Sequence, residues 1–147
     1  MILANLSKGL VMTNTARLLD IVERLMRCWD RRDIEAALNH YTDDVHYAEP
    51  GAGLSLQGRA ALRRHLEECF HTWDARWHIR EYHRLEHTDA LAVFWDLDIA
   101  RNGDFVRLLT KGMHVVTVRG DQVCSDLIYY DRTQLAPLLQ KPAAQRI

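Results

Sequence analysis

Cysteine is scarce in this chain of 147 residues, which has only Cys28, Cys69 and Cys124. The three are far apart, and no CxxC pair or His-rich zinc spacing accompanies them. Each lies within an apolar pattern, so we interpret them as buried free thiols in a reducing compartment. A disulfide-stapled scaffold is thereby excluded. The sequence also predicts no metal site.

The chain also lacks an excess of charge of one sign. Its formal net charge is -1 at pH 7, and it contains no long basic run. The electrostatic signature of a nucleic-acid-binding protein is absent, so we expect no nucleic-acid partner.

Long apolar runs are missing as well. None approaches the roughly 20 residues that a membrane-spanning helix needs, so we expect no membrane partner and a cytoplasmic protein. The opening MILANLSKGLVM is short, carries Lys8 and is followed by no small-residue cleavage site, which argues against a signal peptide. We interpret residues 1–14 as a flexible or loosely docked extension, with Met12 as a second candidate start site.

The first pattern that the sequence does contain is helical periodicity. From about Thr15 to Trp29, apolar residues recur at steps of three and four, which predicts an amphipathic helix. Asp33 has the position of a cap for a second, short helix that reaches Tyr41. A third helix is predicted after Gly58, where Leu62, Leu66, Cys69, Phe70 and Trp73 recur at helical spacing.

After this third helix the periodicity becomes that of strands. Apolar residues occupy every second position over 91–99, an Asn-Gly turn signal follows, and further strands are predicted over 105–118 and over VCSDLIYYD. In the strand over 76–87 the alternation changes parity, which predicts a bulge and leaves open whether Glu81, Tyr82 or His83 faces inward. Helices followed by a meander of long antiparallel strands define an α+β fold.

One short strand, VHYAEP, places a carboxylate in line with apolar residues. Its alternation puts Val45, Tyr47 and Glu49 on one face. Pro50 stops the strand and biases Glu49 toward extended geometry, which would hold its side chain at the strand end. If Tyr47 and Trp29 shield it from water, Glu49 is expected to have a raised pKa and to transfer protons.

Four segments together resemble the nuclear transport factor 2-like superfamily, which includes ketosteroid isomerase, SnoaL-like polyketide cyclases, scytalone dehydratase and limonene epoxide hydrolase. They are CWDRRDIEAALNHYTDDVHYAEP, GRAALRRHL, KGMHVVTVRGDQV and YYDRTQLAPLL. Their order and spacing carry the resemblance. They cover roughly residues 15–139, so we expect one SnoaL-like domain there and a flexible tail over 140–147.

The resemblance implies a cone-shaped, cystatin-like fold. A curved mixed or antiparallel sheet would wrap around three N-terminal helices and enclose a pocket for a small hydrophobic molecule, without a cofactor. It also implies a homodimer through the outer face of the sheet. The last three strands are apolar on both faces, which indicates that their outer face is covered, as it would be in such a dimer.

Different relatives imply different site residues. Ketosteroid isomerase has its catalytic carboxylate before a proline at the end of the first strand, which matches Glu49. Its two oxyanion donors correspond to about Leu25 and Met113, neither of which can donate a hydrogen bond, so steroid isomerase activity is disfavoured. His114 has the opposite strand parity to Met113 and is expected to face away from the pocket.

Epoxide hydrolase members share a tyrosine that matches Tyr47 and an aspartate that matches Asp98, whereas Asp96 replaces their arginine. SnoaL-like cyclases have an acid/base aspartate on the last strand, which matches Asp126. An acid flanked on its own face by apolar residues is costly to bury without a partner or a purpose.

Our first hypothesis is therefore a SnoaL-like isomerase, cyclase or (de)hydratase that acts on a small hydrophobic carbonyl substrate. Its catalytic residues would be Glu49, Asp126 and Tyr47. The predicted substrate-binding residues are Trp29, Phe70, Phe94, Asp96, Asp98, Met113, Ile128 and Tyr130.

Structural explanations compete with these assignments. Glu49 could cap a backbone amide at the rim, and Asp126 could pair with an arginine such as Arg107 or Arg80. The alternative function is a non-catalytic domain that binds a hydrophobic ligand or a protein, and epoxide opening is a third possibility. The fold alone does not choose among them.

Overall fold

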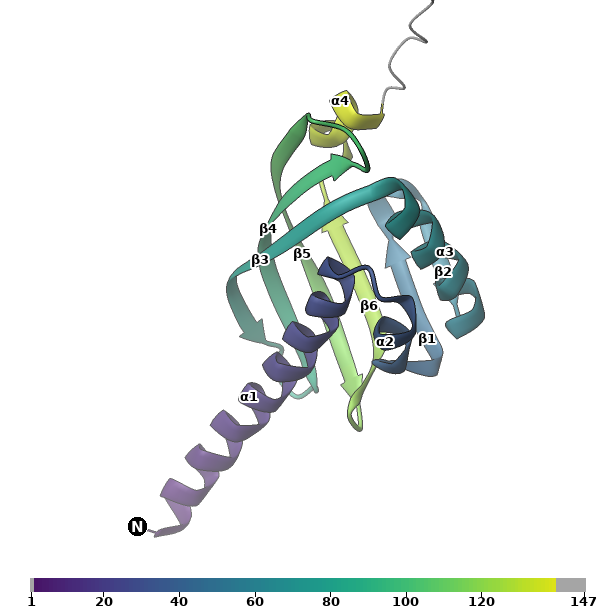
Figure 1. Cartoon of the computed structure of the whole chain (residues 1–147). Helices are drawn as coiled ribbons and strands as arrows, with labels where there is room; N and C mark the ends of the chain where they lie inside the picture. Colours follow the sequence, from purple (N-terminus) through teal and green to yellow (C-terminus); the bar gives the residue numbers. More distant parts are fainter. Residues whose placement is uncertain (1, 140–147) are drawn as a thin grey trace, which may run out of the picture.

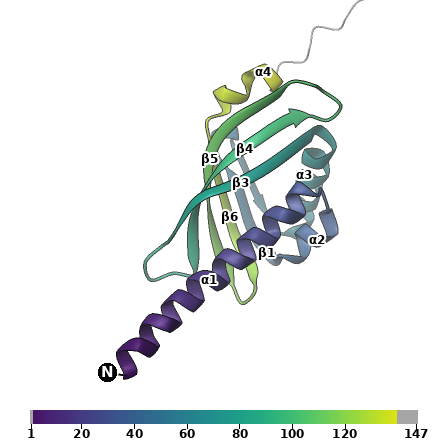
Figure 2. The ribbon, with the colours of Figure 1, turned by 60° about the vertical axis from the view of Figure 1, so that its left-hand side comes forward.

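The computed structural model describes residues 2–139, with only the backbone described over residues 2–13. The predicted tail at 140–147 lies outside this part of the chain. Helix α1 (Ile2–Asp30) begins well before the predicted start near Thr15, so most of the predicted extension has a helical backbone. Its first turns project beyond the sheet (Figures 1 and 2). No helix among the described residues is long and apolar enough to cross a membrane.

The helices α2 (Ile34–Asn39) and α3 (Arg59–Thr72) follow the predicted pattern. The Asp33 carboxylate caps α2 as expected, because its Oδ1 accepts a hydrogen bond from the Ala36 N–H at 3.1 Å. Two boundaries differ from the prediction. Tyr41 begins strand β1 (Tyr41–Glu49) instead of ending α2, and an additional short strand, β2 (Leu54–Gln57), lies between Pro50 and the third helix.

Six strands form one curved, unclosed mixed sheet in the order β2-β1-β6-β5-β4-β3. Strand β1 runs parallel to β6, and the other neighbours are antiparallel. The predicted α+β fold is confirmed. The four long strands and the final helix are β3 (Trp73–Arg84), β4 (Ala90–Arg101), β5 (Arg107–Arg119), β6 (Gln122–Tyr130) and α4 (Ala136–Leu139).

The core lies between the sheet and the three larger helical segments. Helix α1 crosses one face of the sheet, as Figure 1 shows, and its predicted apolar stripe is buried there, including Leu18 and Val22. From the sheet, Val93 on β4 and Val116 on β5 are buried in the same cluster. The face of β4 and β5 that carries Val93 and Val116 is therefore the inner face of the sheet.

The predicted bulge in β3 is confirmed by a register shift between Ile79 and Glu81. After the bulge, Tyr82 pairs with Val93, so Tyr82 shares the inner face of the sheet. His83 meets the ring of Phe94 edge-on at 6.1 Å, on the outer face.

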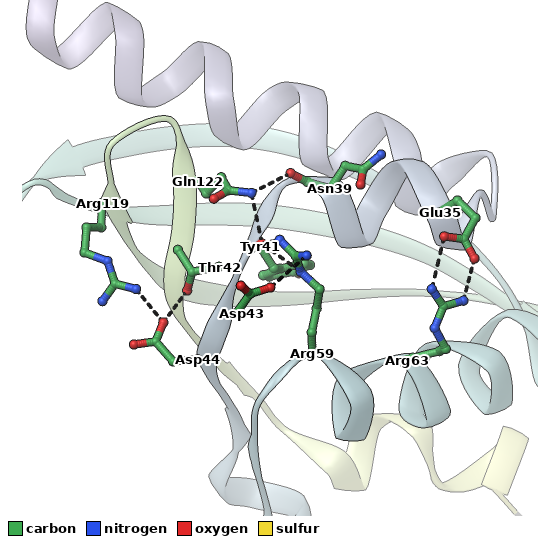
Figure 3. Close-up of polar contacts among 10 residues, drawn as sticks. All are labelled: Glu35, Asn39, Tyr41, Thr42, Asp43, Asp44, Arg59, Arg63, Arg119 and Gln122. Carbon is green, nitrogen blue, oxygen red and sulfur yellow. Dashed lines mark hydrogen bonds and ion pairs between the residues drawn. The ribbon is translucent and has the colours of Figure 1, made fainter.

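The start of β1 is anchored from two sides, as Figure 3 shows. From α3, the Arg59 Nε donates to the Tyr41 carbonyl at 3.1 Å and Nη1 pairs with Asp43 at 2.9 Å. From β6, the Gln122 side-chain amide donates to the same carbonyl at 3.2 Å. These bonds fix the point at which β1 enters the sheet.

Gly112 on β5 makes room for an aromatic side chain of the inner face. It pairs with Trp95 on β4, and a Cβ at Gly112 would lie 2.3 Å from the Trp95 Cη2 atom. Because glycine has no Cβ, the indole of Trp95 packs against the β5 backbone.

Candidate active site

A cavity of about 350 Å³ lies between the sheet and helices α1 and α3. Its wall is mainly aromatic and aliphatic, and its size suits a small organic molecule. The aromatic residues are Trp29, Tyr47, Phe70, Trp73, Trp77, Trp95 and Tyr130. The wall also contains one carboxylate, Glu49, beside one imidazole, His65.

Glu49 is the polar centre of this wall. Its Oε2 accepts a hydrogen bond from the Tyr47 hydroxyl at 2.9 Å and lies 2.9 Å from the His65 Nε2. Its Oε1 accepts a hydrogen bond from the Tyr130 hydroxyl at 3.0 Å. The Glu49 side chain is only 13% exposed, so these three groups replace most of its hydration.

These partners decide the charge of the site. Burial pushes the pKa of Glu49 up, but the hydrogen bonds from His65, Tyr47 and Tyr130 outweigh burial and lower that pKa below its ordinary value. The predicted raised pKa is therefore wrong. Burial also opposes a charge on His65, yet its contacts with Cys69 and Glu49 raise the pKa of His65 to about 10. At neutral pH the two side chains form an imidazolium–carboxylate pair.

The local sequence explains how these groups meet. Strand β1 ends at Glu49, and Pro50 begins a short 3₁₀ turn, so the carboxylate stays at the end of the strand as predicted. His65 and Cys69 are one helical turn apart on α3, and the Cys69 Sγ lies 3.4 Å from the His65 Nε2. Sequence reasoning missed His65. The signal was its spacing of four residues from Cys69 and of three from Leu62, which places it beside the buried face of the helix.

The predicted wall residue Trp29 organises the aromatic wall. Its ring stacks on Tyr47 at 6.2 Å and meets Trp77 edge-on at 6.2 Å. Its indole N–H donates to the Tyr41 hydroxyl at 3.3 Å, and that hydroxyl donates to the Asp126 Oδ2 at 3.0 Å. Asp126 therefore supports the wall from behind.

The structure does not bring Asp126 into the large cavity. Asp126 is 2% exposed and lines a second cavity of about 20 Å³, enough for about one water molecule. His114 lines this small cavity too, with its Nδ1 3.4 Å from the Asp126 Oδ1. Among the described residues, the Asp126 Oδ1 and the His114 Nε2 have no hydrogen-bond partner.

The prediction that His114 faces away from the interior is wrong. His114 pairs with Val93 on β4 and with Ile128 on β6, both of which face the core. It must share their side of the sheet, because directly paired residues lie on one face. Met113, its neighbour on β5, therefore faces outward.

Six of the seven predicted wall and catalytic residues on β1, β6 and the helices line the large cavity, whereas Asp126 lies behind its wall. The six are Trp29, Tyr47, Glu49, Phe70, Ile128 and Tyr130. Phe94, Asp96, Asp98 and Met113 do not line it, because they share the outer face of β4 and β5.

On that outer face, Asp98 accepts a hydrogen bond from the Arg107 Nε at 2.6 Å, and Asp96 pairs with Arg80 at 3.0 Å. The two arginines considered as partners of Asp126 therefore bind other acids. The side chains that the epoxide hydrolase resemblance required are not assembled around one cavity. Within residues 2–139, no group of three or more His, Cys, Asp or Glu side chains is arranged to hold a metal ion.

A curved, unclosed mixed sheet wrapped around helices that close one cavity defines the nuclear transport factor 2-like fold. Within that class, a family model described as the SnoaL-like domain matches residues 22–125. The chain belongs to the SnoaL-like family. A comparison with curated proteins gives no match.

Solved structures agree on the fold. A protein assigned as a polyketide cyclase from Xanthomonas campestris pv. campestris is 18% identical, with a TM-score of 0.71 over 86% of this chain and 99% of that one. A ketosteroid isomerase-like fold from Catenulispora acidiphila, in complex with trimethylamine, is 16% identical, with a TM-score of 0.72 over 83% and 93%. A computationally designed 17-OHP binder is 16% identical, with a TM-score of 0.70 over 80% and 95%.

Proposed function

We propose that this protein is a cofactor-independent enzyme that transfers a proton on a small hydrophobic carbonyl compound, with Glu49 as the base. The reaction would be an isomerisation, a cyclisation or a (de)hydration. The observation that carries the proposal is an ionised carboxylate fixed at the wall of an apolar, mainly aromatic cavity. A carboxylate in such a cavity is a candidate general base, and the lowered pKa of Glu49 keeps it ionised and able to accept a proton at neutral pH.

The lone pairs of Glu49 support this role. Each carboxylate oxygen can accept about two hydrogen bonds. Oε2 has both Tyr47 and His65 as partners, whereas Oε1 has Tyr130 alone. Oε1 therefore keeps an acceptor site for a proton taken from a substrate carbon.

Removing a proton beside a carbonyl leaves an enolate, whose oxygen needs hydrogen-bond donors. Tyr130 and His65 both line the cavity and both contact Glu49. Either can turn its hydrogen bond toward the enolate oxygen as Glu49 becomes protonated and loses its charge. One such donor is typically worth about a hundred- to a thousand-fold in rate. This pair replaces the oxyanion donors that the sequence lacks at Leu25 and Met113.

Asp126 has a different role in this proposal. It does not line the cavity that holds Glu49, so we infer that it is a positioning residue. It orients Tyr41, which in turn holds Trp29 against Tyr47. Tyr47 lines the cavity and donates a hydrogen bond to Glu49, and we infer that it keeps the carboxylate oriented.

The test needs no knowledge of the natural substrate. Exchange of α-protons of cyclohexanone and 1-indanone for deuterium in D₂O is followed by NMR with the full chain. We expect acceleration over buffer, and a loss of about a hundred- to ten-thousand-fold in Glu49→Gln. Asp98→Asn, on the outer face, is the matched control and should exchange at the wild-type rate. No acceleration by the wild type, with ligand binding seen by tryptophan fluorescence, would contradict the enzyme proposal.

That negative outcome would favour the second candidate, a non-catalytic hydrophobic-ligand carrier. The observation that favours it is the aromatic wall, which can hold a flat molecule without any chemistry. The designed 17-OHP binder shows that this fold also occurs in a protein made for binding. A carrier should bind its ligand equally well as Glu49→Gln.

We also propose that the outer face of the sheet forms a homodimer interface. Phe94 and Met113 pair there, Leu109 is 83% exposed, and Tyr129 is 41% exposed. Exposed apolar side chains gathered on one sheet face are typical of an interface. Sedimentation should give twice the chain mass, and Leu109→Glu should shift it toward the monomer. A wild-type monomer would overturn this assembly.

A further inference from the structure

The large cavity contains a thiol that the proton-transfer proposal does not use. Cys69 lines the cavity on α3, and its Sγ lies 3.4 Å from the His65 Nε2. The other two cysteines do not line this cavity. Cys28 is 3% exposed in the core, and Cys124 donates to the Thr117 carbonyl at 3.5 Å. One thiol of three is therefore open to a ligand in the cavity.

The neighbours of Cys69 are those that activate a sulfur nucleophile. The thiolate is the reactive form of cysteine, and a cationic imidazole beside it stabilises that form. The contacts of His65 with Cys69 and with Glu49, whose Oε2 lies 2.9 Å from the His65 Nε2, favour the charged imidazole. The His65 ring is itself held against Tyr47, with ring centres 5.1 Å apart. The charge beside Cys69 is thus fixed in position.

The wall indicates which electrophile fits. Its stacked and edge-on aromatic rings favour a flat, conjugated molecule. The Tyr130 hydroxyl lines the same cavity and can donate a hydrogen bond to a carbonyl oxygen. We propose that Cys69 is a nucleophile that adds to α,β-unsaturated carbonyl compounds bound in this cavity, so that the protein forms a thioether with a conjugated ligand.

The addition balances without any further reagent. The S–H bond breaks and its proton passes to the His65–Glu49 pair, where the Glu49 carboxylate accepts it. The sulfur electron pair forms a bond to the β-carbon, and the C=C electrons move onto the carbonyl oxygen as an enolate. The proton then returns to the α-carbon. The net reaction adds the thiol across the double bond, with no oxidation, reduction or leaving group.

The test measures labelling of the full chain by 2-cyclohexen-1-one, with intact mass spectrometry and peptide mapping. We expect Cys69 to be labelled at least about tenfold faster than Cys124 or Cys28 within the same molecule. The rate should saturate with enone concentration, and the saturated analogue cyclohexanone should slow it. Labelling of Cys69 no faster than Cys124, or a rate linear in enone and unaffected by cyclohexanone, would overturn the proposal.

Variants distinguish activation of the Cys69 thiol by His65 from simple accessibility of that thiol. His65→Gln should slow labelling of Cys69 by about tenfold or more, while Cys124→Ser, outside the cavity, should leave it unchanged. Circular dichroism checks that His65→Gln is folded, and the comparison of thiols within the wild type holds even if it is not. Wild-type speed in folded His65→Gln would remove the proposed activation. Because labelling is read on Cys69 itself, the result is independent of whether Glu49 exchanges α-protons.

Discussion

Two acids on neighbouring, parallel strands, the partly buried Glu49 and the buried Asp126, have opposite surroundings. Glu49 at the end of β1 has two tyrosine hydroxyls and an imidazole as partners and lines a cavity of about 350 Å³. Asp126, in the middle of β6, has one hydroxyl donor, from Tyr41, and an imidazole at 3.4 Å, and lines a space of about 20 Å³. Both are in line with apolar residues of their strands.

The difference follows from position along the strand. The end of β1 borders the large cavity, where a side chain can meet a ligand, whereas the middle of β6 borders the small cavity, which residues of α1 line from the other side. Tyr47 and Asp126 are paired across β1 and β6, so the two acids are only about one side-chain position apart on the same inner face. This small difference in position separates Glu49, which can contact a ligand, from Asp126, which orients the aromatic wall.

The largest expected effect comes from removing the covered acid. Asp126→Ala should lower the free energy of unfolding by about 3–5 kcal/mol, because it leaves the Tyr41 hydroxyl and His114 buried without their partner. Urea unfolding measures this loss. Asp126→Asn, which can still accept from Tyr41, should lose clearly less. A loss below about 1 kcal/mol for Asp126→Ala would mean that the acid does not organise the wall.

The contrast between the two acids also marks what the sequence could predict. Helix and strand periodicity gave the α+β fold, and an apolar alternation that stops at a proline was enough to place Glu49 and Tyr47. The strands β4 and β5 were harder, because they carry apolar residues on both faces. Alternation then says which residues share a face but not which face is inner. For that reason Phe94 and Met113 were expected in the pocket, and both lie on the other side of the sheet.

The partners of Glu49 were less accessible to sequence reasoning than Glu49 itself. His65 comes from α3 and Tyr130 from the end of β6, and only the folded sheet brings them to one carboxylate. The expected raised pKa considered burial alone. Three donors reverse its direction, and their convergence is a tertiary property that no local pattern reports.

The second prediction concerns the charge pair on the cavity side. NMR titration should give His65 a pKa near 10 in the wild type, and Glu49→Gln should lower it markedly, because the imidazolium loses its carboxylate. An unchanged His65 pKa in Glu49→Gln would contradict the pair. Asp126→Asn is the matched control, and it should leave the pKa of His65 unchanged.

The pair also sets a pH dependence of stability. The lowered pKa of Glu49 contributes stability above its ordinary value of 4.5, which is lost as pH falls through the folded-state value. The raised pKa of His65 contributes stability below its ordinary value of 6.5, which is lost as pH rises toward about 10. The stability difference between the wild type and Glu49→Gln should therefore be greatest between about pH 4.5 and 6.5 and shrink on both sides, as urea unfolding at several pH values can check.

The smallest expected effect is that of an acid on the outer face. Asp98 is 38% exposed and paired with Arg107, so Asp98→Asn should change the free energy of unfolding by less than about 1 kcal/mol. It should leave α-proton exchange and Cys69 labelling unaltered, because the sheet separates Asp98 from the cavity. The same urea and labelling assays measure both. A large loss of either activity would place Asp98 back at the pocket and would mean that the inner and outer faces of β4 are assigned the wrong way round.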